Sequence, residues 1–189
     1  MMVRQFLSDQ SGASAAEMAL ILPMLIVLMF GGMEAGYYFW SEHKVVKAVR
    51  DGARYAGRLP VSTYSCPANP GFGAAGSITD AAAETRISNL TRTGTINGQG
   101  QPVIPGWTDD NNGTVDKTNQ LRVVVQCFDK TGDASASVAA NTGMFESRND
   151  VIRVRVVANT AYEPLFSTLG FDTASIGLAA SSESIVMGM

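Results

Sequence analysis

Charged residues are scarce in this sequence. Only 16% of its 189 residues are Asp, Glu, Lys or Arg, below the roughly 25% typical of soluble globular chains, whereas 46% are hydrophobic. The 14 basic and 17 acidic residues give a net charge of -3, which provides no general attraction to nucleic acid. We therefore expect no nucleic-acid partner, and we expect some apolar residues to lie outside an ordinary soluble core.

Groups that bind metals or perform catalysis are also few. The single histidine, His43, and two cysteines cannot form the usual four-ligand zinc site without carboxylates. No serine lies in a Gly-x-Ser-x-Gly setting. Residues 71–76 fit a bare Gly-x-Gly-x-x-Gly pattern, but they follow a proline-rich loop rather than a strand, which argues against a dinucleotide site. We predict no enzyme activity and no cofactor.

The segment 109–116 is rich in the oxygen ligands that hard cations such as calcium prefer. Its candidate ligands are Asp109, Asp110, Asn111, Asn112 and Asp116. No glutamate stands at the twelfth position that the EF-hand spacing requires, and Asn112-Gly113 is itself a turn signal. We therefore expect a surface turn here and no metal site.

A long apolar run lies near the N-terminus. Sixteen uncharged residues separate Glu17 from Glu34, and as a helix rising about 1.5 Å per residue they span roughly 24 Å. The hydrocarbon core of a bilayer is about 30 Å thick, so one glutamate lies near or inside its boundary. Tyr37, Tyr38 and Trp40 favour the headgroup region, which leaves Glu17 as the deeper carboxylate. The run predicts a membrane-spanning helix, with Glu17 either partnered or at the opposite interface.

A secretory signal peptide is a poorer interpretation of the same run. Its N-terminal part carries only Arg4, opposed by Asp9, and no small-x-small cleavage site follows Phe30. Pro23 would cost a soluble helix about 3 kcal/mol, but membrane helices tolerate proline because neighbouring groups satisfy the freed carbonyl. We expect a retained helix with a kink near Pro23.

The residues just before the apolar run form a distinctive junction. The order GASAAE at residues 12–17 resembles the processing site of type IV pilin-like precursors, which prepilin peptidase cuts after the glycine. Together with the apolar run and the later segment DGARYAG (51–57), it makes residues 8–58 similar to the TadE-like pseudopilins of the tight adherence (Flp) pilus assembly system. Major Flp pilins are much shorter and tend to carry tyrosine where this chain has Met18, so the resemblance is to a minor pseudopilin.

The resemblance implies a role for each junction residue. Gly12 would be the last leader residue, Ala13 the mature N-terminus and Glu17 the fifth mature residue. In the family, this glutamate meets the N-terminal amine of a neighbouring subunit and favours helix assembly. Electrostatics agrees, because cleavage would bring the new amine of Ala13 within about one helical turn of Glu17, where opposite charges neutralise each other in lipid.

A basic helical face follows the aromatic residues. Apolar residues recur at helical spacing between residues 45 and 56. The other side carries Lys44, Lys47, Arg50, Arg54 and Arg58. Residues 41–60 have a net charge of +3 and residues 1–12 are neutral, which contradicts a simple positive-inside orientation. We favour the pilin-like orientation, with the C-terminal part outside the cytoplasm, because the rule weakens for long translocated domains. The basic face either contacts anionic headgroups or is solvated, and we favour a solvated face.

Beyond the helix, the pattern predicts a small α+β head. Gly57 and Pro60 indicate the helix end, and residues 62–77 are rich in Gly, Pro and Ser, as in a loop. The remaining predicted elements are a helix at 80–90, an exposed loop at 93–119, strands at 121–128, 151–157 and 174–186, and a short helix from Pro164 to Gly170.

The two cysteines, Cys66 and Cys127, both lie beyond the apolar run, where an extracytoplasmic location permits oxidation. A disulfide between them would close a loop of about sixty residues and stabilise the fold by roughly 4 kcal/mol on the chain-entropy model. Two separately buried thiols are the alternative.

Combined with the resemblance, the sequence predicts a leader at 1–12, a transmembrane and stalk helix at 13–58, and an extracytoplasmic α+β head at 59–189. The resemblance implies a non-enzymatic minor pseudopilin of the bacterial inner membrane, with its head in the periplasm, that takes part in assembly or initiation of an adhesive pilus. Its expected partners are the membrane, prepilin peptidase, other pilins or pseudopilins and the assembly platform. The alternative is a single-pass protein whose tethered head binds a ligand or partner directly.

Overall fold

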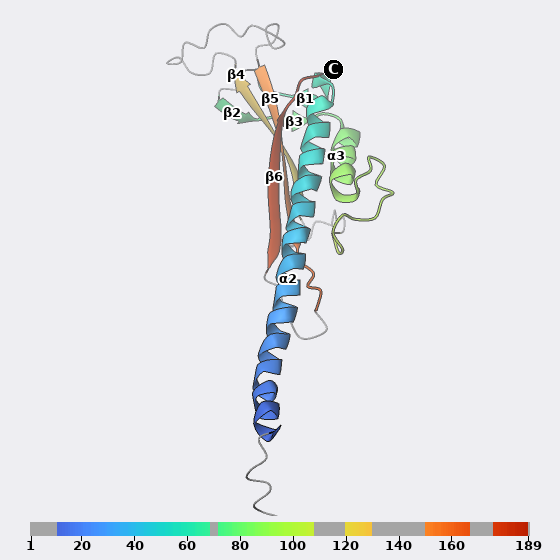
Figure 1. Cartoon of the computed structure of the whole chain (residues 1–189). Helices are drawn as coiled ribbons and strands as arrows, with labels where there is room; N and C mark the ends of the chain where they lie inside the picture. The colour runs from blue at the N-terminus through green and yellow to red at the C-terminus, as the bar shows by residue number, and fades with distance from the viewer. Residues whose placement is uncertain (1–10, 69–71, 108–119, 130–149, 167–175, 189) are drawn as a thin grey trace, which may run out of the picture.

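One long helix carries a small α+β head at its C-terminal end, which confirms the predicted fold class (Figure 1). The structure is a computed structural model and describes residues 11–68, 72–107, 120–129, 150–166 and 176–188. The N-terminal half of the helix projects away from the head, and the C-terminal half lies along it (Figure 1).

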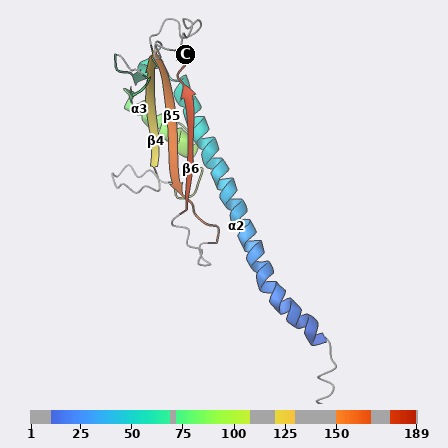
Figure 2. The ribbon, with the colours of Figure 1, turned by 90° about the vertical axis from the view of Figure 1, so that its left-hand side faces the viewer.

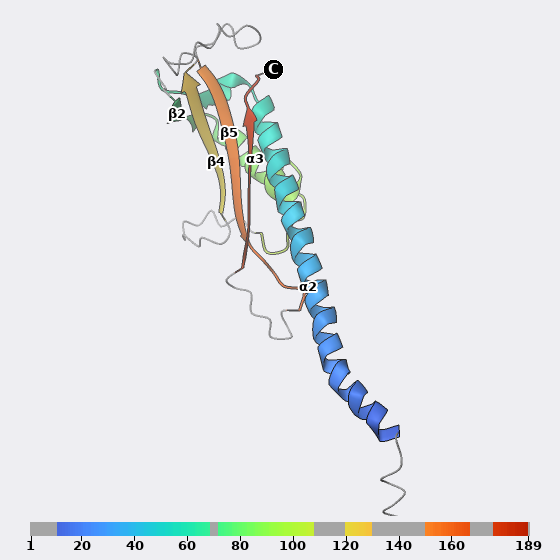
Figure 3. The ribbon, with the colours of Figure 1, turned by 60° about the vertical axis from the view of Figure 1, so that its left-hand side comes forward.

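The long helix, α2, runs from Ser11 to Arg58 and has 48 residues, which corresponds to about 72 Å. It continues through Pro23, and Figure 3 shows its axis changing direction in the blue N-terminal part. Within the described ranges, α2 is the one helix whose length and composition allow it to cross a membrane. Its most apolar part is not buried against the head, so these side chains require another apolar environment.

The helix ends where the sequence predicts. Pro60 lacks an N–H group to continue the helix, and the Leu59 N–H bonds the Ala56 carbonyl oxygen at 3.2 Å. The chain returns to the same place at its C-terminal end, because the Met187 N–H donates to the Gly57 carbonyl oxygen at 3.0 Å. The upper end of α2 is thereby tied to the last residues of the head.

A four-stranded antiparallel sheet forms most of the head, with strand order β2, β4, β5, β6. These strands are β2 (Phe72–Ala75), β4 (Gln120–Asp129), β5 (Asp150–Ala161) and β6 (Gly177–Ile185). The three predicted strands are therefore present, and β5 is longer than predicted. In β5, Ile152, Val154 and Val156 are buried in strict alternation, as a half-buried strand requires.

The core lies between one face of the sheet and two helices, α2 and α3 (Ala81–Thr93). Figure 2 shows the strands side by side, with α2 running along β6. From α2 the core receives Val45, Ala48, Val49, Ala53 and Ala56. The upper half of α2 is therefore part of the head's hydrophobic core as well as the continuation of the apolar anchor.

The predicted helix at 80–90 is confirmed as α3 and extends to Thr93. The Asp80 carboxylate caps its start by accepting the Ala82 N–H at 2.9 Å. At its end, Gly94 adopts a left-handed conformation with φ of 71°, and its N–H bonds the Leu90 carbonyl oxygen.

Two predicted loops contain ordered structure that the sequence pattern did not indicate. The segment 62–77 begins within the 3-10 turn Val61–Thr63 and contains β2. It also contains the short strand β1 (Tyr64–Ser65), which pairs with β3 (Ser77–Ile78) at the end of the segment. In the segment predicted as an exposed loop, Ile104 and Trp107 are buried in the core. Glycine and proline content was a poor guide here, because short edge strands tolerate both residues.

The predicted short helix at 164–170 is wrong over its first described residues. Leu165 and Phe166 form a turn, and the remainder lies outside the described residues. The oxygen-rich segment 109–116 also lies outside them.

Candidate functional site

The proposed processing junction lies in the first turns of α2. Gly12 is exposed, and Glu17 is exposed one helical turn after Ala13. Positions four apart share one face of a helix, so Ala13 and Glu17 lie on the same side of α2. Glu17 makes no hydrogen bond or ion pair with any residue in the described part of the chain.

The other carboxylate of the apolar run, Glu34, is bound by the head. It accepts hydrogen bonds from the Tyr162 hydroxyl at 2.5 Å, from the Leu165 N–H at 3.2 Å and from the Phe166 N–H at 3.3 Å. Three donors from the turn after β5 therefore converge on one side chain of α2. Because charge-assisted hydrogen bonds are the stronger kind, this cluster holds the lower end of the head against the helix.

Aromatic rings surround the Glu34 contact. The Phe30 and Phe166 rings meet edge to face at 5.0 Å, and Tyr38 meets Tyr162 in the same manner at 5.2 Å. Tyr37 also contacts the Tyr162 ring, at 6.1 Å. We call Phe30, Glu34, Tyr37, Tyr38, Tyr162 and Phe166 the helix–head junction. It places the turn after β5 at the level of the aromatic residues of α2.

The pKa of Tyr162 favours its role as a hydrogen-bond donor in this junction. Its burial, followed by its hydrogen bond to Glu34, raises the pKa of the Tyr162 hydroxyl well above the ordinary value for tyrosine. The phenol therefore keeps its proton to a higher pH than in the unfolded chain and continues to donate to the carboxylate there.

The DGARYAG segment has a packing role that the resemblance alone did not explain. A methyl group on Gly52 would lie 2.1 Å from the Thr91 Oγ1 atom, and one on Gly57 would lie 2.3 Å from the Ser184 Oγ atom. Between these glycines, Ala53 and Ala56 are fully buried. Small residues at these positions allow α2 to approach α3 and β6 closely, so this segment is where the head packs most tightly against the helix.

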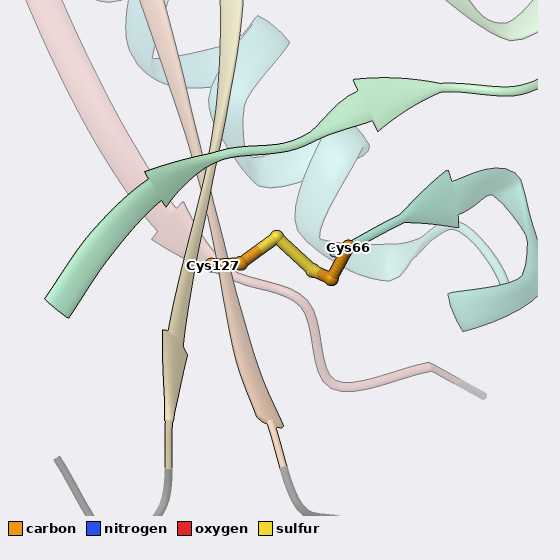
Figure 4. Close-up of a disulfide and its surroundings, with 2 residues drawn as sticks. All are labelled: Cys66 and Cys127. Carbon is orange, nitrogen blue, oxygen red and sulfur yellow. A yellow bond between two sulfur atoms is a disulfide. The ribbon is translucent and has the colours of Figure 1, made fainter. Parts of the chain in front are cut away.

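The disulfide predicted between Cys66 and Cys127 is confirmed, with Cα atoms 5.9 Å apart (Figure 4). It joins the segment after β1 to the C-terminal part of β4. A methyl group on Gly76 would lie 2.7 Å from the Cys127 sulfur, so this glycine makes room for the bridge. In the described part of the bare glycine pattern, 72–76, the strand β2 is followed by Gly76 beside the disulfide and then by β3, so no helix follows this strand directly as in a phosphate loop.

The structure brings together the two cysteines but not all the predicted site residues. Gly12, Ala13 and Glu17 lie near the free end of α2, and the disulfide lies in the head at the other end (Figure 1). The helix–head junction was missed entirely, although a glutamate inside an apolar run was a signal that Glu34 requires partners. Among the residues that the structure describes, no cluster of three or more His, Cys, Asp or Glu could hold a metal ion.

A family model described as TadE-like protein matches residues 12–54. The match begins at the glycine of the processing junction, covers the apolar run and the helix–head junction residues of α2, and ends within DGARYAG. No curated protein and no solved structure matches the chain. TadE-like proteins are generally structural and non-enzymatic. The resemblance in the sequence is therefore confirmed over residues 12–54, where this chain is similar to TadE-like proteins.

Proposed function

We propose that the protein is a non-enzymatic minor pseudopilin that takes part in assembly or initiation of a tight adherence pilus for surface attachment. It is made with a leader at residues 1–12, and prepilin peptidase cleaves after Gly12. Residues 13–58 form the transmembrane and stalk helix, and residues 59–189 form a head outside the cytoplasm. Its partners in this role are other pilins or pseudopilins and the assembly platform.

The observation that carries this proposal is that the two carboxylates bounding the apolar run, Glu17 and Glu34, differ in their hydrogen-bond partners. The head supplies three hydrogen-bond donors to Glu34, whereas Glu17 has no partner among the described residues. A carboxylate in the membrane is costly, and such groups are usually paired or functional. Because Glu34 is satisfied within its own chain, Glu17 is the carboxylate left for contact with another subunit.

The spacing of Glu17 from the junction suits this contact. Cleavage after Gly12 would create a positive amine at Ala13, one turn from Glu17 and on the same side of the helix. In a row of parallel helices, the amine of one subunit can approach Glu17 of the next with a small axial shift. Charge pairing in a medium of low dielectric constant then favours association of the helices.

The helix–head junction supports the placement of the head at the membrane surface. Glu34 lies one turn below the aromatic residues Tyr37, Tyr38 and Trp40, which favour the headgroup region. The turn containing Leu165 and Phe166 then rests at this interface, with the sheet above it. The head therefore stands directly on the bilayer and is not separated from it by a linker.

N-terminal sequencing with intact mass measurement tests the proposal. The protein is purified from membranes of cells with and without prepilin peptidase. We expect a chain that begins at Ala13 only where the peptidase is present. An uncut chain in both strains, or a cut beyond Phe30, would favour the tethered or secreted binding protein instead.

A further inference from the structure

The side of α2 that faces away from the head carries an uninterrupted set of cations. Lys47, Arg50, Arg54 and Arg58 are all exposed. At about 100° per residue they fall within an arc of roughly 80°, on the far side of the helix from the buried Val45, Val49, Ala53 and Ala56. We call these four residues the cationic face. Figure 2 shows α2 with the sheet on one side and no drawn element against the other.

The cationic face is not neutralised within the described residues. None of its four side chains forms an ion pair there, and Asp51 is the carboxylate that flanks the set on α2. Some other cations have partners: Arg153 and Arg155 both pair with Glu183, and the Lys44 Nζ atom lies 3.6 Å from the centre of the Trp40 ring. With Asp51 included, the face carries a net charge of +3.

Lipid headgroups are poorly placed to meet this charge. The headgroup region adds about 5–8 Å to each side of the hydrocarbon core. Measured along α2 from Trp40, Lys47 lies about 10 Å above the interface, Arg54 about 21 Å and Arg58 about 27 Å. Since α2 is one continuous helix, a tilt of about 20° changes these heights little, and most of the cationic face stands above the headgroups.

A second copy of this chain is also a poor partner for this face. Two parallel copies in one membrane would bring the same four cations opposite each other, and like charges across an interface disfavour association. A different chain that presents carboxylates at the same height would complement this charge.

Below the cationic face, the same side of α2 permits close approach. Gly32 and Gly36 lie on it by helical position, and no atom stands within 4 Å of a methyl group placed on either. Small residues four apart allow membrane helices to pack closely. The exposed Met29 and Trp40 share this side, so a neighbouring helix would approach α2 most closely at Gly32 and Gly36.

We propose that the cationic face of α2 binds the helix of a different single-pass membrane protein, whose segment directly outside the membrane carries carboxylates at helical spacing. This inference rests on the proposed membrane placement of α2 and names a partner for the assembly role. It requires neither cleavage after Gly12 nor the charge of Glu17.

Site-specific photo-crosslinking in the native cells tests this partner. A photoreactive amino acid replaces the exposed Lys47 in the full-length protein, and mass spectrometry identifies both the adduct and the cross-linked residue. We expect one main adduct with a different membrane protein, at a helical segment bearing at least two carboxylates just outside its span. Arg54→Glu should reduce this adduct about tenfold.

A matched control uses the outer face of the sheet. Arg122 is exposed on β4, so Arg122→Glu makes the same change in charge away from α2 and should leave the adduct unchanged. Formation of the Cys66–Cys127 disulfide in each variant reports that the head has folded.

Four outcomes would overturn the proposal: adducts with a second copy, adducts with lipid, no adduct, or an adduct insensitive to Arg54→Glu. A chain that is not cleaved after Gly12 but still gives the acidic-helix adduct would reject the pseudopilin assignment and retain this one. The two proposals therefore fail in distinguishable ways.

Discussion

The Tyr162 hydroxyl donates a hydrogen bond of 2.5 Å to the Glu34 carboxylate, and this bond joins residues 128 positions apart in the chain. It connects the end of the longest strand, β5, to the apolar half of α2. It is one of the contacts that hold the lower end of the head against α2.

Loss of this hydroxyl should loosen the helix–head junction. Hydrogen bonds to charged groups contribute about 1.5–3 kcal/mol, so we expect Tyr162→Phe to lower the free energy of unfolding by this amount. Chemical denaturation of the full-length protein in detergent measures it. Tyr37→Phe is the matched control, because the Tyr37 hydroxyl makes no hydrogen bond with the described residues. Equal effects of the two changes would show that the bond to Glu34 contributes nothing special.

The junction should also weaken at alkaline pH. The pKa of Tyr162 is raised in the folded protein from its ordinary value of 10.0, first by burial and then by the Glu34 hydrogen bond. The unfolded chain therefore loses this proton at lower pH than the folded one, so the stabilisation is complete below pH 10 and declines above it. Denaturation from pH 8 to 11 should show a steeper loss for the wild type than for Tyr162→Phe. Tyr64, whose pKa is raised mainly by burial, contributes a separate decline that both proteins share.

Alanine at Gly52 should disturb the packing of the head against α2. The added methyl group would meet the Thr91 Oγ1 atom, and overpacking of this kind costs about 1–3 kcal/mol. Gly31→Ala is the control, since no atom lies within 4 Å of a methyl group there and alanine is the better helix former. Thermal denaturation should show a lower Tm for Gly52→Ala alone. Thr91→Ala in the same chain should restore part of the loss, and no restoration would argue against the steric cause.

Removal of the disulfide should destabilise the head without unfolding α2. The bridge joins cysteines separated by 61 positions, and loss of a bridge of this kind typically costs about 2–5 kcal/mol. Alanine at both Cys66 and Cys127 should lower the denaturation midpoint, while the helical circular dichroism of the anchor persists. Reduction of the wild type should reproduce this effect. A midpoint that does not move would mean that the packing around β4 holds the head without the bridge.

Replacement of Glu17 should separate processing from assembly. If its carboxylate meets the amine of a neighbouring subunit, Glu17→Ala will be cleaved normally but lost from co-purified assemblies, and pilus display will fall at least tenfold. Glu42→Ala serves as the control, since this carboxylate lies beyond the apolar run and makes no hydrogen bond or ion pair with the described residues. The readouts are N-terminal sequencing, co-purification with other pilins and a surface pilus count. Unchanged assembly by Glu17→Ala would contradict a contact between Glu17 and the amine of a neighbouring subunit.

The periodic and apolar patterns were sufficient to predict the helix from the membrane to Arg58, the three long strands and α3. Each of these elements depends on its own residues, as the alternation of Ile152, Val154 and Val156 in β5 shows. The cysteine pair was predictable because only one intramolecular pairing of two cysteines exists.

The contacts between distant segments were not predictable in the same way. Nothing near Glu34 in the sequence indicates that its donors come from Tyr162, Leu165 and Phe166, because the pairing exists only once β5 lies beside α2. The burial of Trp107 was missed for a related reason: its neighbours suggest a loop, and its burial depends on packing against the finished core.

The continuity of α2 has a mechanical consequence. Above the change of axis in its N-terminal part, α2 runs as one helix into the hydrophobic core of the head, so no loop separates the anchor from the sheet. Rotation of the membrane half about its axis turns the whole head by the same angle, and an axial pull is transmitted to the packing around Gly52 and Gly57. The orientation of the head therefore follows that of the upper part of α2, on which it is packed.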